Sequence, residues 1–351
     1  MVILAIESTC DETGAAVARG FGEPKAVEIL SDVKASSAEV QAKYGGVIPE
    51  IAAREQAAAI IPVIEEAIDQ AKIRVGEIEA IAVTEGPGLI GSLLIGVETA
   101  KALALAWKKP LIAVNHIAAH VFANWIQDIT PGVSVPQLPA VALIVSGGHT
   151  DLMLLSSLTD WKWIGGTRDD AAGEAFDKAA RAMGFPYPGG PLIAKASQEA
   201  VIALPAGLKL PRPMIHEDNL EMSFSGLKTA LVEVMKSPAF AEATARSSRE
   251  ELIKALAREF NQAVADVLVK KTMKAVEQYQ PKSVLLAGGV AANVMLREGL
   301  AKTVKEVRNE FFCPDLKYCT DNAAMIAACA LLRPNYIDPL KLRPNPGLEV
   351  R

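Results

Sequence analysis

Residues 2–18 read VILAIESTCDETGAAVA, which is a short apolar run, a polar turn and a second apolar run. A continuous apolar run such as Val2–Ile6 is typical of a strand that is buried on both faces. The same pattern returns at residues 140–155, AVALIVSGGHTDLMLL, with a polar turn at 146–151. This internal repeat predicts a duplicated α/β architecture, with one strand–turn–strand unit in each of two domains and the two turns facing each other across a cleft.

Further helical and strand patterns lie between and after the two repeats. Several of the apolar strands are followed directly by glycine or polar residues, and open α/β sheets bind ligands just beyond the carboxyl ends of their strands. Functional residues are therefore expected in these turns. The predicted segments are helices over 49–71, 91–107 and 250–279 and strands over 80–83, 111–114 and 283–286.

The length of 351 residues is sufficient for two domains of ordinary size. The segment 128–139 contains three prolines and is the best candidate for a linker between them. We therefore predict an N-terminal domain over 1–127 and a C-terminal domain over 128–332. The proline-rich residues 333–351 are predicted to form an irregular tail.

The overall composition limits the classes of function. The formal net charge of −5 does not fit an autonomous nucleic-acid binder, so any contact with RNA requires a local basic patch or a partner protein. An aromatic content of 5% argues against a platform for stacking single-stranded bases.

The location is predicted to be cytoplasmic, without a membrane span. The cysteines Cys10, Cys313, Cys319 and Cys329 form no C-x-x-C pair and are interpreted as cytosolic thiols. The N-terminus has no basic region of the kind that precedes a signal sequence. The apolar segment 89–107 is interrupted by Glu98 and Lys101.

A histidine pair indicates a metal site. Residues 114–120 read VNHIAAH, so that His116 and His120 would project from the same face of a helix and can bind one metal ion. The spacing alone is equally compatible with two ordinary histidines at a helix start. Asp321, at the start of an alanine-rich helix, is the candidate for a third ligand, although an aspartate there can simply cap the helix.

Two known classes of catalytic site do not match. A zinc peptidase of the His-Glu-x-x-His type needs a glutamate after the first histidine, where this chain has Ile117. No Walker P-loop motif and no dinucleotide-binding glycine motif is present. The glycine turns at 146–148 and 288–289 can still present backbone N–H groups to a phosphate or ribose, and together they fit a nucleotide cleft.

Taken together, an ordered series of motifs over residues 2–330 closely resembles the bacterial TsaD family, the tRNA adenosine threonylcarbamoyltransferases that were once labelled sialoglycoprotein endopeptidases. The motifs that carry the resemblance are ESTCDET at 7–13, GPGL at 86–89, GSL at 91–93, the histidine pair, SGGHT at 146–150, DDAAGEAFDK at 169–178, PGGP at 188–191, FSGLKT at 224–229, GGVAAN at 288–293 and TDN at 320–322.

The resemblance implies two RNase H-like domains of the actin/Hsp70/sugar-kinase (ASKHA) type around a nucleotide cleft. It also implies that Asp321 completes a metal site with His116 and His120. The residues implied to contact the nucleotide-linked substrate are Ile144, Val145, Ser146, Gly147, Gly148, Asp177, Gly190 and Asn293.

The implied reaction transfers the threonylcarbamoyl group from threonylcarbamoyl-adenylate to N6 of adenosine 37 in tRNAs that read ANN codons and releases AMP. Fe²⁺ is the implied metal and Zn²⁺ the alternative. Our own hypothesis is that Glu12 or Asp11 orients or deprotonates the attacking amine. The implied partners are the tRNA, a TsaB-like paralogue and a TsaE-like ATPase, with the adenylate made by a separate synthase.

Two other functions fit the same fold. A small-molecule kinase or ATPase would not need the histidine pair, and a non-catalytic scaffold paralogue would lack the metal triad. Two positions depart from the family pattern, because Ala118 replaces a frequent glutamate and Gln56 a frequent histidine; both affect only hydrogen bonding around the site. Candidates for tRNA contact near the motifs are Arg181, Lys195 and Lys228.

Overall fold

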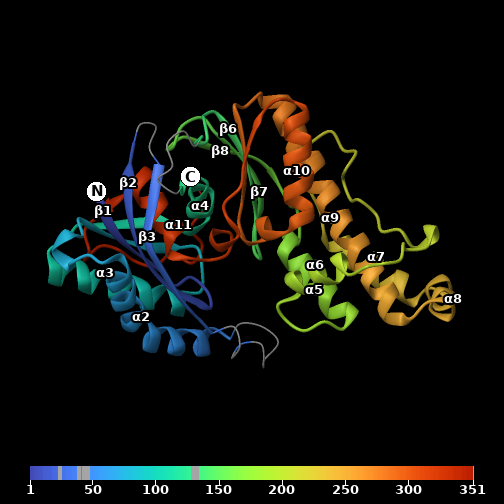
Figure 1. The fold of residues 1–351 in the computed structure, drawn as a ribbon, viewed down its shortest axis with the longest axis horizontal. Coiled ribbons are helices and arrows are strands. Elements are labelled where there is room, and N and C mark those ends of the chain that lie inside the picture. Colours follow the sequence, from blue (N-terminus) through green and yellow to red (C-terminus); the bar gives the residue numbers. More distant parts are fainter. Residues whose placement is uncertain (23–25, 38–40, 42–47, 128–133, 351) are drawn as a thin grey trace. The chain divides into compact units, whose positions relative to one another are not determined.

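Two mixed β-sheets organise the computed structural model, which describes residues 1–22, 26–37, 41, 48–127 and 134–350. Contacts divide the chain into two units, each with one sheet and its own helices (Figure 1). Unit 1 comprises Met1–Gln137, Ser156–Trp161 and Pro314–Arg351, and unit 2 comprises Leu138–Leu155 and Lys162–Cys313.

Unit 1 contains a six-stranded sheet in the order β11-β5-β4-β1-β2-β3. Strand β1 runs parallel to β4 and antiparallel to β2. The elements are β1 (Val2–Glu7), β2 (Glu12–Phe21), β3 (Ala26–Ser36), α2 (Pro49–Ala71), η1 (Val75–Glu77), β4 (Ala80–Gly86), α3 (Ile90–Trp107), β5 (Leu111–Asn115), α4 (His116–Phe122), η2 (Ala123–Trp125), η5 (Leu316–Tyr318), α11 (Ala323–Leu332) and β11 (Tyr336–Ile337).

Helices cover both faces of this sheet. On one face, α2 and α3 bury apolar side chains such as Ile64 and Val97 in a common core with Leu4 and Ile6 of β1. Against the other face lies α11, whose sequence AAMIAACALL is apolar on every side and is buried almost throughout. Burial on both faces explains why β1 is a continuous apolar run.

The position of α11 corrects the predicted domain boundaries. The predicted second domain includes residues 314–332, but these residues belong to unit 1. A helix without a polar face must be enclosed on all sides, and the sheet of unit 1 together with α4 provides that enclosure. The predicted tail is not wholly irregular either, because β11 pairs with β5 and Leu342 is fully buried. Part of the predicted linker, 128–133, lies outside the described residues.

Unit 2 contains a five-stranded sheet in the order β10-β9-β6-β7-β8. Strand β6 runs antiparallel to β7 and parallel to β9, which is parallel to β10. The elements are β6 (Ala140–Val145), β7 (Thr150–Leu155), β8 (Trp161–Gly166), α5 (Ala172–Met183), α6 (Gly189–Gln198), η3 (Ala206–Leu208), α7 (Ser225–Lys236), α8 (Pro238–Arg246), α9 (Arg249–Tyr279), β9 (Ser283–Ala287), η4 (Gly289–Ala292), α10 (Val294–Glu306) and β10 (Glu310–Phe312).

The two sheets repeat one strand order. The series β3-β2-β1-β4-β5 in unit 1 corresponds to β8-β7-β6-β9-β10 in unit 2, with the two polar turns at equivalent places after β1 and β6. The duplicated α/β architecture predicted from the sequence is therefore confirmed.

Helix α3 is the single described helix that is long and apolar enough to cross a membrane by length and composition alone. Its buried side chains pack on β4 and α2, so the core accounts for part of its apolar character. The apolar side chains Ile90, Leu94 and Leu105 are exposed by 52%, 41% and 52%.

Candidate metal centre and substrate-binding turns

The two histidines lie on a short buried helix that follows β5 directly. Asn115 caps this helix, since its Oδ1 accepts a hydrogen bond from the N–H of Ala118 at 3.0 Å. The cap fixes the first turn, so that the side chains of His116 and His120 meet on one face with ring centroids 4.8 Å apart.

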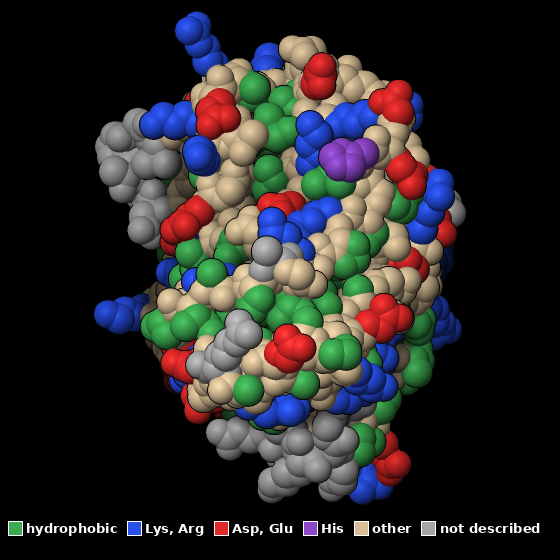
Figure 2. Space-filling view, turned by 90° about the vertical axis from the view of Figure 1, so that its right-hand side faces the viewer, with side chains coloured by type: hydrophobic (Ala, Val, Ile, Leu, Met, Phe, Trp, Pro, Cys, Tyr) green, Lys and Arg blue, Asp and Glu red, His purple; other side chains and the backbone are tan. Residues whose placement is uncertain are grey.

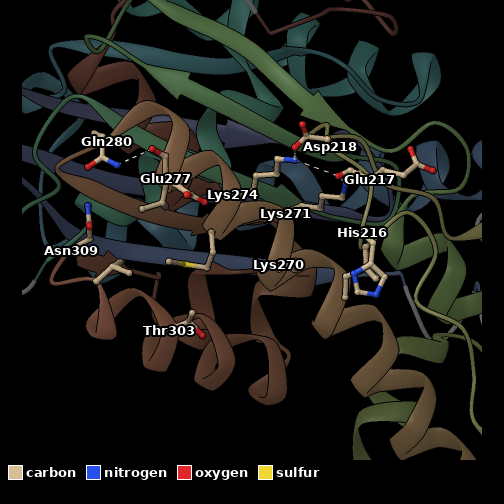
Figure 3. Close-up of a pocket in the computed structure, with 14 residues that line it drawn as sticks. His216, Glu217, Asp218, Lys270, Lys271, Lys274, Glu277, Gln280, Thr303 and Asn309 are labelled. Carbon is tan, nitrogen blue, oxygen red and sulfur yellow. Dashed lines mark hydrogen bonds and ion pairs between the residues drawn. The ribbon is translucent and has the colours of Figure 1, made fainter.

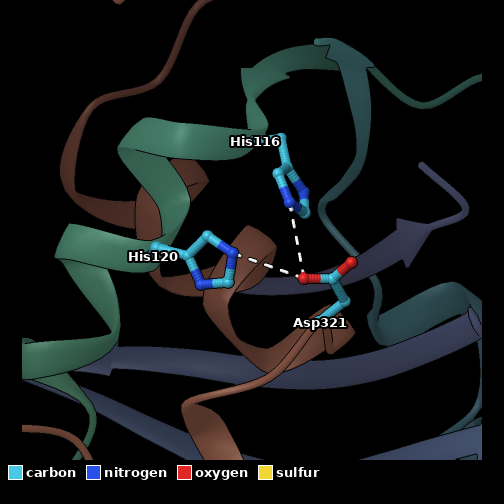
Figure 4. A group of neighbouring side chains, drawn as sticks. All are labelled: His116, His120 and Asp321. Carbon is cyan, nitrogen blue, oxygen red and sulfur yellow. Dashed lines mark ion pairs between the residues drawn. The ribbon is translucent and has the colours of Figure 1, made fainter. Parts of the chain in front are cut away.

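Asp321 lies beside both histidines (Figure 4). Its Oδ1 is 3.5 Å from Nε2 of His116 and 3.3 Å from Nε2 of His120. The cap of α11 is Asn322, whose Oδ1 accepts from the N–H of Met325 at 2.8 Å. Asp321 is thus not needed as a helix cap, and its carboxylate faces the histidines.

The three side chains fit a metal ion. Ligand atoms that surround one cation at about 2.1 Å stand about 3.0–3.4 Å apart, close to the two distances from Asp321. All three ligand atoms lie within 4.8 Å of one another. Nδ1 of His120 is buried without a hydrogen bond to any described residue, and Nε2 faces the carboxylate of Asp321, as two ligands of one ion would.

Glu7 orients the first histidine. It is fully buried at the end of β1, and its Oε2 lies 3.2 Å from Nδ1 of His116 and accepts from the hydroxyl of Thr84 at 2.6 Å. The N–H of Thr9 donates to the other carboxylate oxygen at 2.6 Å. A carboxylate on Nδ1 leaves Nε2 of His116 free to bind a metal. This role of Glu7 was not predicted, although a charged residue at the end of a buried strand was an available signal.

The ionisable groups of this site shift one another's pKa values. Burial by itself would lower the pKa of His116, but the nearby carboxylates of Glu7 and Asp321 raise it to about 10. Burial lowers the pKa of His120. The two histidines outweigh the effect of burial on Asp321 and hold the pKa of its carboxyl well below the usual range. At neutral pH the site therefore holds one extra proton, on His116.

Metal binding is accordingly expected to release one proton. The apparent Zn²⁺ affinity should rise about tenfold for each pH unit between pH 7 and 9, because His116 must lose its proton to act as a ligand. The stability of the protein without metal depends on pH in the opposite direction to the metal affinity. The stabilisation by the charged His116 is complete below the unfolded pKa of 6.5 and is lost as the pH rises through about 10.

Zn²⁺ titrations across this pH range measure the slope. In a Glu7→Gln variant the slope should flatten, because the carboxylate that raises the pKa of His116 is gone. A wild-type affinity that does not change with pH would contradict the proton assignment.

Asp11 ends the turn between β1 and β2 and Glu12 begins β2, in the same unit as the metal centre. Burial raises the pKa of both carboxyls, and the charge of Asp321 contributes to the increase. Glu12 accepts from the hydroxyl of Ser36 at 3.0 Å and lies 3.8 Å from Nζ of Lys34. A carboxylate with a raised pKa is a stronger base than an exposed one.

The predicted substrate residues all belong to unit 2. Ile144 and Val145 end β6, and an ideal Cβ at Gly147 or Gly148 would meet no atom within 4 Å, so a ligand can approach this backbone closely. Asp177 of α5 accepts from the N–H of Gly189 at 2.8 Å, next to Gly190. The turn at η4, which precedes Asn293, packs against both α5 and β6.

Asn261 and Ser197 are two further residues of unit 2 that the sequence did not single out. Asn293 donates to Oδ1 of Asn261 at 2.7 Å, and Asn261 lies 3.4 Å from the hydroxyl of Ser197. Asn261 is 3% exposed on the long helix α9, where a polar residue on an otherwise apolar face was the available signal. This chain of hydrogen bonds holds Asn293 in place.

Asp169 anchors the FSGLKT motif. Its carboxylate accepts hydrogen bonds from the backbone N–H groups of Phe224 and Ser225, at 2.8 and 3.1 Å, and from the hydroxyls of Ser223 and Ser225. These hydrogen bonds outweigh the effect of burial and lower the pKa of Asp169. The start of α7 is thereby held beside the start of α5.

The basic candidates for tRNA contact, Arg181, Lys195 and Lys228, are exposed on α5, α6 and α7.

A hollow of about 720 Å³ in unit 2 is separate from the predicted substrate turns (Figure 3). It is lined by α9, by the end of α10 and by residues 215–218, at the amino ends of β9 and β10. Three lysines and three acidic residues line it, and Lys274 pairs with Asp218. Acidic and basic side chains are also mixed on the face of unit 2 turned to the viewer in Figure 2. This balance of charge gives no electrostatic reason to assign RNA binding to the hollow.

Comparison with known proteins supports one family. A family model described as TsaD: tRNA N6-adenosine threonylcarbamoyltransferase matches residues 28–328. The protein of that name from Geobacillus thermodenitrificans is 45% identical over 352 residues, which cover 99% of this chain and 96% of the relative. The one from Bacillus licheniformis is 47% identical over 332 residues, which cover 93% and 90%.

A solved structure shares the fold at low sequence identity. HypF from T. kodakarensis has a TM-score of 0.59 and 13% identity, over 94% of this chain and 49% of HypF. The full-length HypF structure in its phosphate- and nucleotide-bound form gives a TM-score of 0.58 and 11% identity, over 94% of this chain and 46% of HypF. These likenesses concern the fold alone and agree with the predicted architecture of the actin/Hsp70/sugar-kinase type.

Proposed function

The chain belongs to the TsaD family of tRNA N6-adenosine threonylcarbamoyltransferases, and from this premise we propose that it transfers the threonylcarbamoyl group from threonylcarbamoyl-adenylate to N6 of adenosine 37 in tRNAs that read ANN codons. In this reaction a bond forms between N6 and the carbamoyl carbon. The bond from that carbon to the phosphate oxygen breaks, AMP leaves and N6 loses a proton.

The metal centre carries this proposal. His116, His120 and Asp321 would hold one divalent cation, and two imidazoles with one carboxylate are a donor set that suits Fe²⁺, with Zn²⁺ as the alternative. The chemistry that the bound cation supplies is Lewis-acid polarisation of the carbamoyl carbonyl. Glu7 fixes the ring of His116 for this purpose.

The turns of unit 2 are proposed to bind the adenylate. Backbone N–H groups of Gly147 and Gly148 would hold its phosphate, and Ile144, Val145 and Ser146 would flank the nucleotide. The carboxylate of Asp177 would accept from a hydroxyl group of the substrate beside Gly190. The open space next to Gly147 and Gly148 supports close contact with the backbone.

Glu12 or Asp11 is proposed to orient or deprotonate N6. An exocyclic amine on a purine is a weak nucleophile, so its position relative to the carbamoyl carbon should dominate the rate. The raised pKa values of both carboxyls support a role in accepting the proton.

Replacement of Glu12 by alanine is expected to lower the transfer rate about 100-fold, because a positioned general base typically contributes that much or more. Single-turnover formation of modified adenosine measures the effect. A Lys34→Met variant removes the neighbouring charge and keeps the carboxylate, so it should stay within about threefold of wild type. Full turnover by Glu12→Ala would exclude Glu12 from this role and leave Asp11 as the candidate.

Partners are proposed from the surface of unit 1 and from the family. The exposed apolar side chains Ile61 of α2 and Ile90, Leu94 and Leu105 of α3 offer a surface for a TsaB-like paralogue. The tRNA would contact Arg181, Lys195 and Lys228. A TsaE-like ATPase and a separate synthase that supplies the adenylate complete the proposed system, which would operate in the cytoplasm.

The direct test is transfer of labelled threonine from threonylcarbamoyl-adenylate to unmodified tRNA by the metal-loaded protein with its partners. Label is expected on adenosine 37, with release of AMP. The same tRNA with guanosine at position 37 is the matched control and should stay unlabelled. No transfer by folded, metal-loaded and partner-supplemented protein would overturn the proposed function.

A further inference from the structure

Every carbonyl oxygen from Ser8, which follows β1, to Glu12, the first residue of β2, has a hydrogen-bond donor. The carbonyls of Thr9 and Asp11 accept from the backbone N–H groups of Leu89 and Ser37. The carbonyl oxygens of Ser8, Cys10 and Glu12 surround a single side-chain nitrogen, Nε2 of Gln56, whose two hydrogens they share. The segment, which bends at residues 9–11 between two antiparallel strands, is therefore held at each of these carbonyls.

Gln56 reaches this segment from the middle of α2. Its Nε2 lies 3.3, 3.1 and 3.0 Å from the carbonyl oxygens of Ser8, Cys10 and Glu12. The side chain is 1% exposed, and its Oε1 is buried without a hydrogen bond to any described residue. Since all three neighbours are acceptors, the NH₂ group must face them, and the opposite orientation of the amide is excluded.

One NH₂ group thus connects α2 to three points of the segment that carries Asp11 and Glu12. The hydroxyl of Ser92 on α3 also donates to the carbonyl of Cys10, at 2.9 Å, so that two helices hold the centre of the segment. The positions of the Asp11 and Glu12 side chains depend on the position of the backbone of residues 8–12. Removal of the Gln56 donor would leave the carbonyls of Ser8 and Glu12 without it and the carbonyl of Cys10 with Ser92 alone, and would let both carboxylates move.

We propose that Gln56 is a positioning residue for threonylcarbamoyl transfer, which acts by fixing the backbone of residues 8–12 and through it the carboxylates of Asp11 and Glu12. This inference rests on the proposed function. It requires no contact between Gln56 and the substrate. The metal ligands should be independent of it, because His116, His120 and Asp321 lie on other segments of the chain and the hydroxyl of Thr84, outside residues 8–12, donates to Glu7.

The proposal predicts a selective loss of rate in Gln56→Met, which keeps the length of the side chain and removes its donor. The rate constant for transfer should fall about 10- to 100-fold, as expected when a reacting group moves by about 1 Å. Zn²⁺ affinity and the KM for the adenylate should stay within about twofold of wild type. Gln70→Met is the matched control, because Gln70 lies exposed on the same helix and donates a hydrogen bond to Glu66, away from residues 8–12.

A Gln56→Glu variant adds a pH-dependent readout. Ionised, the carboxylate has no donor and faces three carbonyl oxygens, whereas the protonated acid can donate one hydrogen bond. Its transfer rate relative to wild type should therefore recover as the pH is lowered from 8 to 6. A purely structural loss of packing would give the same ratio at every pH.

Carboxyl ¹³C resonances provide a measurement that does not depend on turnover. The signals of Asp11 and Glu12, assigned with Asp11→Asn and Glu12→Gln, should shift in Gln56→Met and stay in place in Gln70→Met. Unshifted signals, a wild-type rate in folded Gln56→Met, or an equal loss of metal affinity and rate would each overturn the positioning role. Absence of transfer by the wild type would instead count against the proposed function, with the resonances still deciding the role of Gln56.

Discussion

A His116→Ala variant is expected to lose its bound cation and at least about 1,000-fold of its transfer rate. Removal of one of the three ligands leaves His120 and Asp321, which are too few to hold a divalent ion tightly. Loss of Lewis-acid polarisation corresponds to several kcal/mol of transition-state stabilisation, and each 1.36 kcal/mol is about a factor of ten in rate. Metal content per chain and modified adenosine in the tRNA should decline together.

The chain supplies a matched control for this variant. His216 is exposed beside the hollow of unit 2 and belongs to neither proposed site, so His216→Ala should retain its metal and its rate. Asp321→Asn tests the same centre from the other chain segment, since an amide has no charge to offer the cation. A metal-free His116→Ala protein that transfers at more than a tenth of the wild-type rate would show that the cation is not required.

A Gly288→Ala variant is expected to disrupt the adenylate-binding turns. Gly288 has φ +90°, and an ideal Cβ at this position would lie 2.4 Å from the carbonyl oxygen of Val145. The left-handed backbone alone costs a non-glycine residue about 1–3 kcal/mol, and the contact must be relieved by separating the two turns. We expect a lower melting temperature and about a 100-fold loss of transfer at subsaturating adenylate.

Gly289→Ala is the matched control for strain. A Cβ at Gly289 would meet no atom within 4 Å. The melting temperature of Gly289→Ala should therefore equal that of the wild type, whatever the effect of the substitution on adenylate binding. Thermal unfolding separates the two variants, and AMP titration measures the binding site directly. If Gly288→Ala has the melting temperature and the AMP affinity of the wild type, the close approach of the two turns is not needed for substrate binding.

Local sequence signals were sufficient for the repeated strand–turn–strand units. The strand Ala140–Val145 and the helix Pro49–Ala71 have the predicted bounds, because an apolar run between turn residues and a long alanine-rich segment are patterns that neighbours in the chain determine. The repeat of one pattern then implied the duplication of the fold. His116 and His120 could be paired for the same reason, since four residues separate them on one helix.

The remaining features depend on contacts between distant parts of the chain. Whether Asp321 caps a helix or faces the histidines was open in the sequence, and the cap formed by Asn322 decides it. The contact of the Gln56 amide with the carbonyls of residues 8, 10 and 12 and the place of α11 in unit 1 have no local signal. The sequence by itself determined the elements and the repeat, because periodicity and turn chemistry act over a few residues. Only the tertiary structure decided which side chains meet, because burial of apolar faces and pairing of buried polar groups join residues far apart in the chain.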